Sequence, residues 1–108
     1  MSVLVAYCTC PDAASADAIA QALVAERLAA CVNRLPGVRS TYRWQGAVEQ
    51  ADEVLLLIKT TAARVDALAA RLRQLHPYEL PELVAVEARA GLPDYLQWVA
   101  ASTTPTDP

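Results

Sequence analysis

The 108-residue sequence lacks several features that mark common classes of protein. It has no phenylalanine, three glycines, three cysteines and a single histidine. Its net charge is −3, and no basic stripe is present, which argues against a nucleic-acid partner, because such proteins release counterions with clustered lysine and arginine. No apolar run approaches the ~20 residues of a membrane helix, so we expect no membrane partner either.

The scarcity of cysteine also bears on location. Three cysteines are an odd number, and residues 1–5 lack the basic region and cleavage site of a signal peptide. We therefore expect reduced thiols and a cytoplasmic protein.

Apolar residues make up 55% of the chain, enough to build the core of one domain. We expect that domain to span residues 1–101. Residues 102–108 contain only small, polar, acidic and proline residues, which predicts a disordered C-terminal tail.

Hydrophobic periodicity predicts an alternation of strands and helices. Strands are expected over 3–9, 31–35, 38–44, 53–60 and 83–87, and helices over 12–28, 61–75 and 91–98. Asp12 and Thr61 are candidate N-caps, and Pro36-Gly37 is expected to end the second strand. The order predicts an α+β fold of the split β-α-β, or ferredoxin-like, kind with a C-terminal helix.

The second and third strand regions are too long for a lone four-stranded sheet, so residues 42–52 should project as an extended β-hairpin. This hairpin carries Tyr42, Trp44 and Val48. A free apolar edge invites pairing with another chain, and a head-to-tail contact can close into a ring. The sequence therefore predicts an oligomer that is held partly by the hairpin.

The only histidine lies in a stiff loop over residues 75–82. Pro77 and Pro81 restrict the residues before them, so the side chains of His76, Tyr78 and Glu82 should point in defined directions. His76 is a candidate metal ligand. The alternative is a loop histidine that hydrogen-bonds a neighbouring backbone carbonyl.

Cys8 and Cys10 lie two residues apart, so an extended strand would place both thiols on one face. Together they would suit a soft metal such as copper or zinc. The alternative is that both act as small buried hydrophobes. Cys31, among alanine and valine, is interpreted as a core residue.

A second candidate site is a pocket for a small ligand. Lys59 ends an apolar strand, where an unpaired ammonium is costly, and Glu82 opens the strand after the proline loop. We expect Lys59, Glu82, Tyr78 and the hairpin aromatics Tyr42 and Trp44 to form a cleft between subunits. A structural Lys59–Glu82 ion pair at an interface is the alternative.

No catalytic machinery can be assembled from these residues. The chain has one histidine, no glycine-rich phosphate loop and no G-x-S-x-G elbow. We therefore expect a binding or signalling protein that is not an enzyme and has no organic cofactor.

Several motifs, in this order and spacing, resemble the CutA family of small trimeric divalent-cation tolerance proteins. They are Tyr7-Cys8-Thr9, the stretch 28–33 (LAACVN), Tyr42-x-Trp44-x-Gly46, Lys59-Thr60-Thr61, His76-Pro77-Tyr78-Glu79-x-Pro81-Glu82 and Tyr95-Leu96-x-Trp98. The resemblance covers residues 3–101. It implies a ferredoxin-like homotrimer that binds copper or another divalent cation weakly through Cys8 and His76.

One position departs from the family pattern, because Leu75 stands where the resemblance implies a second histidine. Two other functions remain open beside metal tolerance. One is a small-metabolite sensor, since the expected architecture is similar to that of PII signalling proteins. The other is a non-catalytic scaffold that presents its surface to another protein.

Overall fold

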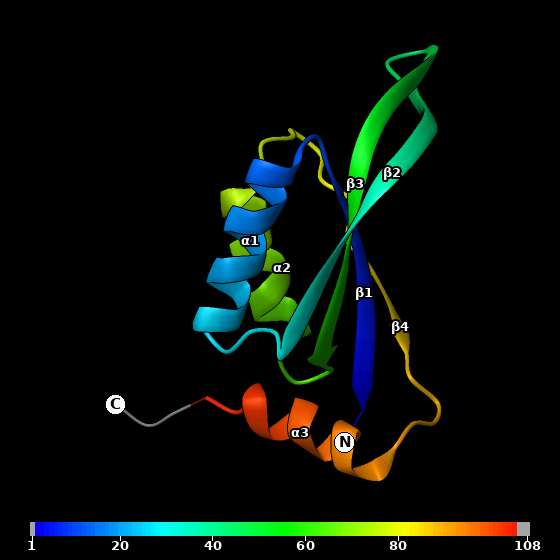
Figure 1. Ribbon diagram of the computed structural model, residues 1–108. Helices are drawn as coiled ribbons and strands as arrows, with labels where there is room; N and C mark the ends of the chain where they lie inside the picture. The colour runs from blue at the N-terminus through cyan, green and yellow to red at the C-terminus, as the bar shows by residue number, and fades with distance from the viewer. Residues whose placement is uncertain (1, 106–108) are drawn as a thin grey trace.

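The computed structural model describes residues 2–105 and shows one antiparallel sheet with two helices on one face and a third helix at its end (Figure 1). The elements are β1 (Val3–Cys10), α1 (Ala13–Ala25), β2 (Cys31–Trp44), β3 (Ala47–Thr61), α2 (Val65–Leu75), β4 (Val84–Glu87) and α3 (Pro93–Ser102). The strand order is β2-β3-β1-β4. This confirms the predicted α+β, ferredoxin-like arrangement, in which β3 inserts between β1 and β2.

The two long helices begin differently. The Asp12 side chain accepts a hydrogen bond from the Ser15 amide at 2.8 Å, so the predicted N-cap of α1 is confirmed. Thr61 was expected to cap α2, and that prediction is wrong. It is the last residue of β3 and is buried, and α2 starts after Arg64 without a side-chain cap.

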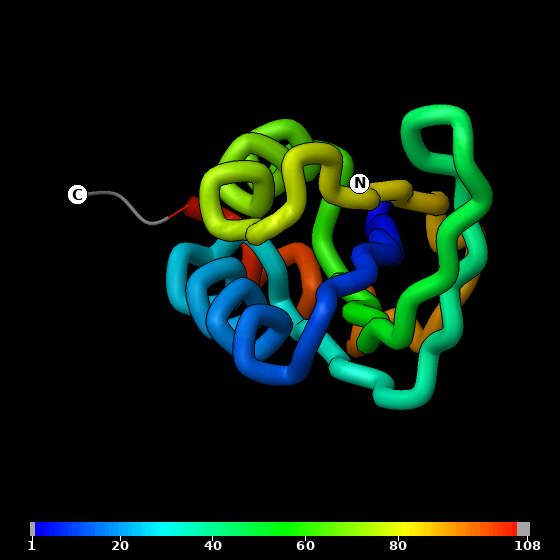
Figure 2. The backbone as a smooth tube through the Cα atoms, turned by 90° about the horizontal axis from the view of Figure 1, so that it is seen from above, coloured from blue at the N-terminus to red at the C-terminus, as the bar shows by residue number. Residues whose placement is uncertain are grey.

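The core lies between the sheet and helices α1 and α2, which lie side by side in both views (Figure 2). Strand alternation sends every second residue of β1 into this layer, namely Ala6, Cys8 and Cys10, which are all fully buried. Ile19 and Leu23 of α1 meet them there, with Leu56 and Ile58 of β3 and Leu68 and Leu72 of α2.

The hairpin is more regular than the sequence suggested. Pro36-Gly37 does not end a strand, because β2 runs through it and absorbs it as a register shift between Leu35 and Val38. Gly37 has a φ of +80°, which glycine reaches at no steric cost and which a bulge of this kind requires. β2 and β3 therefore remain paired as far as Trp44 and Ala47, and the hairpin projects beyond the helices (Figure 1).

On the second face of the sheet, α3 packs only at one end, where Val3 meets Val99 and Leu96, and no helix within residues 2–105 lies over the rest of this face (Figure 1). Direct pairing places Leu57, Tyr7 and Val84 in one row across this face, and Val5 and Val86 in the next. Tyr7, Val84 and Val86 are 37–56% exposed. We call this surface the open face, and it is an apolar surface without a partner in the single chain.

The C-terminal boundary differs from the expected one. Ser102 belongs to α3, and Thr103 is 1% exposed, with its hydroxyl donating to the Val99 carbonyl at 2.9 Å. Arg27 binds the carbonyls of Ala101 and Thr104. The predicted tail therefore starts too early at residue 102, because these contacts hold the chain against the domain. Residues 106–108 lie outside the described part.

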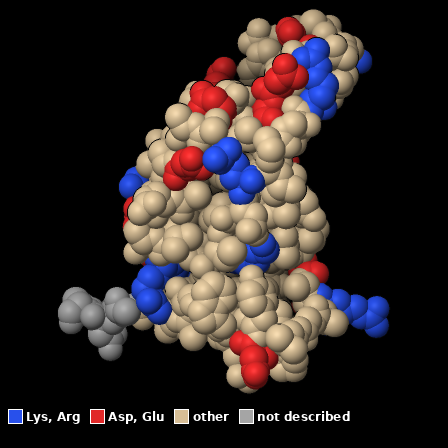
Figure 3. All heavy atoms as spheres, viewed as in Figure 1, with Lys and Arg blue, Asp and Glu red and all other residues tan. Residues whose placement is uncertain are grey.

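Charged side chains of both signs are interspersed on the viewed surface, including the projecting hairpin (Figure 3). There, Arg39 and Asp52 of paired strands form an ion pair of 3.0 Å. Within residues 2–105, no helix combines the length and apolar character that a membrane crossing requires.

The hairpin turn gives the first prediction. Gln45 and Gly46 have φ values of 50° and 83°, as a two-residue turn between right-twisted strands demands. A Cβ at Gly46 would meet nothing within 4 Å, so any cost comes from the backbone alone. We expect Gly46→Ala to lower the free energy of unfolding by about 1–2 kcal/mol.

Gly46→Asn is the matched control, because asparagine tolerates this left-handed backbone better than alanine. Urea denaturation of the three proteins measures the difference. Equal loss in both variants would show that the turn conformation is not the cause.

Candidate metal cluster and adjoining pocket

The loop between α2 and β4 is fixed to the end of β1 by His76. This side chain is 6% exposed, and its Nε2 lies 2.8 Å from the Thr9 carbonyl oxygen. Nδ1 accepts a hydrogen bond of 3.1 Å from the Tyr78 amide. A carbonyl can only accept, so the proton is on Nε2 and the ring is in one tautomer. His76 is thus the loop histidine of the sequence alternative.

His76 also lies beside two thiols. The potential ligand atoms of Cys8, Cys10 and His76 all lie within 4.8 Å of one another, and all three residues are buried. We call this group the thiol–imidazole cluster. It arises because β1 extends through Cys10, one residue beyond its predicted end at Thr9, so both cysteines face the helix side of the sheet.

The cluster has the donor atoms that a soft metal prefers, but these atoms lie farther apart than they would around a bound ion. Ligand bonds of about 2.0–2.3 Å place donor atoms roughly 3.5–4 Å apart around one ion. The three atoms would have to contract by about 1 Å. One nitrogen of His76 would also have to give up its present hydrogen bond. Two thiols and one imidazole are a suitable set for Cu(I) or Zn(II) once these changes occur.

The two thiols do not ionise alike. Contact with the Cys10 sulfur, followed by burial, raises the pKa of Cys8 far above its ordinary value. The same contact lowers the pKa of Cys10. Cys10 therefore loses its proton before Cys8, and a metal that binds both sulfurs as thiolates must displace the protons of both.

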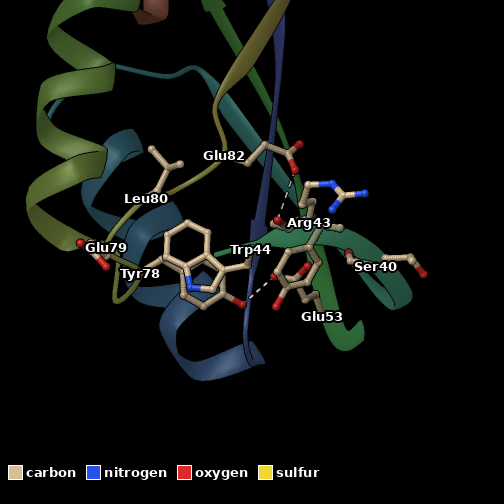
Figure 4. Close-up of a pocket in the computed structure, with 11 residues that line it drawn as sticks. Ser40, Arg43, Trp44, Glu53, Tyr78, Glu79, Leu80 and Glu82 are labelled. Atoms are coloured by element: carbon tan, nitrogen blue, oxygen red, sulfur yellow. Dashed lines mark hydrogen bonds between the residues drawn. The ribbon is translucent and has the colours of Figure 1, made fainter. Parts of the chain in front are cut away.

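A pocket of about 590 Å³ opens on the other side of β1, between the loop and the hairpin (Figure 4). It is lined by Thr9, Ser40, Thr41, Tyr42, Arg43, Trp44, Glu53, Tyr78, Glu79, Leu80 and Glu82. Ser40, Tyr42 and Trp44 pair with alternate residues of β3, so they project from the same side of the hairpin. This side continues the open face.

Tyr78 connects the pocket to the cluster. Its hydroxyl donates to Glu53 Oε2 at 2.6 Å, and its ring lies 4.8 Å from the imidazole of His76. Burial, together with the Glu53 carboxylate, raises the pKa of Tyr78 well above its ordinary value. Both effects favour the neutral phenol, which keeps Glu53 hydrogen-bonded although only 8% of that residue is exposed.

The structure brings together four of the five residues predicted for the ligand pocket. Tyr42, Trp44, Tyr78 and Glu82 all line it, and they do so within one chain. The hairpin aromatics therefore reach the proline loop without a second subunit, because the β2–β3 pair continues past the end of β1, where this loop also lies (Figure 1).

Lys59 does not join them. Its ammonium donates to the Asn33 side chain on the open face, between Val5 and Cys31 of the neighbouring strands. Glu82 instead accepts from the Thr9 hydroxyl, and Thr9 pairs with Leu55, four residues away along β3. This offset corresponds to roughly 13 Å. The Lys59–Glu82 pair is therefore not formed within the chain.

Sequence reasoning missed Glu53 and Arg43 as pocket residues. Glu53 had a usable signal, since it lies at even spacing from Leu55 and Leu57 and so shares their face. Arg43 had no such signal, because the alternating pattern of residues 38–44 places it on a solvated basic face. Cys31 was expected in the core, but it is only partly buried at the start of β2.

Comparison with known proteins places the whole described fold in one family. The sequence profile of the family described as "CutA1 divalent ion tolerance protein" matches residues 4–102. The "Divalent-cation tolerance protein CutA" of Pectobacterium atrosepticum is 48% identical over 99 residues, which are 92% of this chain and 90% of that protein. "Protein CutA" of Mus musculus is 47% identical over 91% of this chain, which spans only 55% of the mouse protein.

Solved structures agree. CutA from Xylella fastidiosa superposes with a TM-score of 0.93 at 52% identity, covering 96% of this chain and all of that one. A more distant structure, titled "periplasmic divalent cation tolerance protein CutA" from Archaeoglobus fulgidus, has a TM-score of 0.91 at 29% identity, covering 94% of this chain and 99% of that one. The chain therefore belongs to the CutA1 divalent ion tolerance family.

Proposed function

We propose that this protein binds a soft metal cation at the thiol–imidazole cluster and thereby contributes to divalent-cation tolerance. The observation that carries the proposal is the convergence of Cys8, Cys10 and His76, whose ligand atoms lie within 4.8 Å. The names of the relatives support a role with divalent cations in general. The thiol–imidazole donor set favours copper or zinc among these cations.

Cys10 replaces the ligand that the sequence lacks. Leu75 stands where the family resemblance implied a second histidine, and its side chain packs against the apolar core. Cys10 lies on the same strand face as Cys8 and supplies a third donor atom beside the other two. The cluster thus reaches the three protein ligands that a metal site needs.

This binding should be weak. His76 already uses both ring nitrogens, one toward Thr9 and the other toward Tyr78. Releasing a buried hydrogen bond costs about 1–3 kcal/mol, which subtracts directly from the metal affinity. No such hydrogen bond holds the sulfurs to the loop. Loss of the Cys8 thiol should therefore lower the metal affinity more than loss of the His76 imidazole.

A second candidate function is small-ligand binding in the pocket. The observation that favours it is the gathering of Trp44, Tyr42 and Tyr78 with Glu53 and Glu82 around one cavity. Pockets of this volume with aromatic walls and a few polar groups are typical ligand sites. A sensor role would join this site to the metal cluster through Tyr78.

We also propose that the protein is a homotrimer. The open face supports this, because Tyr7, Leu57, Val84 and Val86 form an apolar surface that no element within residues 2–105 covers. The short edge strand β4 and the long hairpin offer two different edges. A head-to-tail contact between them can close into a ring.

A cytoplasmic location remains our proposal on the three free cysteines, two of them buried. The archaeal relative is named a periplasmic protein, so cell fractionation is the test of the compartment. We further propose a non-catalytic role, since the relatives are named for ion tolerance and not for a reaction.

The metal proposal predicts an order of effects in a Cu(I) titration against a competing chelator. Cys8→Ser should weaken binding most and Cys10→Ser next, because both remove a thiolate. His76→Ala should weaken it least. Cys31→Ser is the matched control, since this third cysteine lies outside the cluster, and it should bind like the wild type. Unchanged affinity in Cys8→Ser, or tight binding in the Cys8→Ser/His76→Ala double variant, would contradict the proposal.

The trimer proposal predicts three times the chain mass in light scattering coupled to gel filtration. Val86→Lys should shift the protein toward the monomer, because it places a charge on the open face where a partner would bury it. Leu92→Lys is the control, as Leu92 is 71% exposed in the connection before α3. A monomeric wild type at micromolar concentration would end this proposal.

The Tyr78–Glu53 bond predicts a loss of stability at high pH. The pKa of Tyr78 is raised in the folded protein. Above about pH 10, tyrosine ionises in the unfolded chain while Tyr78 keeps its proton. The folded state then binds more protons, so stability falls as pH rises through this range. Tyr78→Phe should reduce this fall.

At neutral pH, Tyr78→Phe should cost about 1 kcal/mol, since Glu53 loses its donor. Tyr7→Phe is the control, because the Tyr7 hydroxyl has no hydrogen bond within the described residues. Urea denaturation of the three proteins at pH 7 and pH 11 measures both effects. The same pH dependence in both variants would show that Tyr78 is not its source.

A further inference from the structure

We infer that the pocket between the hairpin and the proline loop binds an organic cation that carries an ammonium group. This inference rests on the small-ligand candidate above and names its chemical class. It does not depend on metal at the thiol–imidazole cluster, which lies on the opposite side of β1.

The charges that line the pocket favour a cation. Three carboxylates, from Glu53, Glu79 and Glu82, face one guanidinium, from Arg43. The formal sum is −3 + 1 = −2. Arg43 forms no ion pair within the described residues, where the pairs involve Arg34, Arg39 and Arg71. The pocket therefore has a surplus of negative charge that an organic cation would balance.

Glu53 has unused hydrogen-bonding capacity. It is 8% exposed, and within the described part of the chain Tyr78 is its one hydrogen-bond donor. An ionised carboxylate offers about four lone-pair sites, and the second oxygen of Glu53 has no donor among the described residues. This oxygen is not fully buried, since no buried side-chain oxygen in the described part lacks a partner, so a ligand in the pocket can reach it. An ammonium group supplies up to three donors and a compensating charge.

The walls are suited to the same group. Trp44 and Tyr78 both line the pocket, and the Tyr78 hydroxyl donates to Glu53 there (Figure 4). Tyr42 completes the aromatic lining. A cation over a tryptophan or tyrosine face is stabilised by the ring quadrupole, most strongly by tryptophan. Aromatic faces and a carboxylate together distinguish an organic ammonium ion from a neutral molecule of equal size.

A bare metal ion fits this pocket less well. Within residues 2–105, the pocket carboxylates form no group of three ligand atoms close enough for one ion, whereas the cysteines and His76 do. The volume of about 590 Å³ also exceeds what one ion fills and lies in the range of small organic ligands.

The test uses three probes that differ in the charge of their head group, added to the 108-residue protein in the presence of a metal chelator. They are phenethylammonium, the neutral 2-phenylethanol and the anionic 3-phenylpropanoate. Titrations followed by amide NMR shifts report both affinity and position. We expect phenethylammonium to bind about tenfold tighter than the alcohol, with shifts at Tyr78 and Glu53, and no measurable binding of the anion.

Variants assign the effect to the pocket. Glu53→Gln should weaken phenethylammonium binding about tenfold and leave 2-phenylethanol unchanged. Asp52→Asn is the matched control, since it removes the same charge from the next residue, which is 87% exposed at its side chain and pairs with Arg39 outside the pocket. If Glu53→Gln folds poorly, Glu82→Gln tests the same loss of negative charge at a solvent-exposed residue of the pocket.

The outcomes distinguish a failure of the cation assignment from a failure of the ligand site itself. Equal binding of the cation and the alcohol in the pocket, or equal effects of Glu53→Gln and Asp52→Asn, would overturn the cation assignment but keep the ligand site. Preferential binding of the anion would assign the pocket to Arg43 and also overturn it. No binding of any probe would remove the ligand site itself, while leaving the metal proposal untouched.

Discussion

The hydrogen bonds of His76 are the constraint on which both candidate sites depend. One ring nitrogen holds the Thr9 carbonyl at the end of β1, and the other accepts the Tyr78 amide. These two bonds fix the proline loop against the strand and set the tautomer of the imidazole. Without them, neither the third donor of the metal cluster nor the aromatic wall of the pocket would have a defined position.

Three successive residues of β1 then serve two sites because a strand alternates its side chains. Cys8 and Cys10 point to the helix side and meet His76, whereas Thr9 points to the open face and meets Glu82. The sites are separated by the thickness of one strand. Tyr78 contacts both, through its ring to His76 and through its hydroxyl to Glu53. Any movement of His76 toward a metal must therefore displace a residue that lines the pocket.

Local pattern was sufficient to predict most of the fold. The apolar period of α1, the Asp12 cap and the extended run of β1 are each decided by neighbouring residues, and each agrees with the structure. Pro36-Gly37 was predicted to end the second strand because this dipeptide is typical of turns. It forms a bulge instead, because β2 pairs with β3 on both sides of it. Thr61 misled for a related reason, since β3 continues to that residue and buries it.

The pocket was harder to predict, because its members come from three elements whose relative placement depends on tertiary packing. Tyr78 and Glu82 were found through the stiffness of the proline loop, and Tyr42 and Trp44 through alternation in the hairpin. Lys59 was assigned to the same site because an ammonium at the end of an apolar strand needs a partner. That reasoning identified the need correctly but not the partner, which is Asn33 on the adjacent strand.

The position of Lys59 carries one more consequence for assembly. Its ammonium lies on the open face among Val5, Cys31 and Val86, where a partner subunit would exclude water. The Asn33 amide is a neutral acceptor, so it satisfies one donor of the ammonium without neutralising its charge. Burial of a charge in this state is unfavourable unless the partner supplies an acceptor or a carboxylate. A trimer that covers the open face must therefore either leave Lys59 at a wet rim or bring an acidic group to it, and this requirement restricts how the subunits can meet.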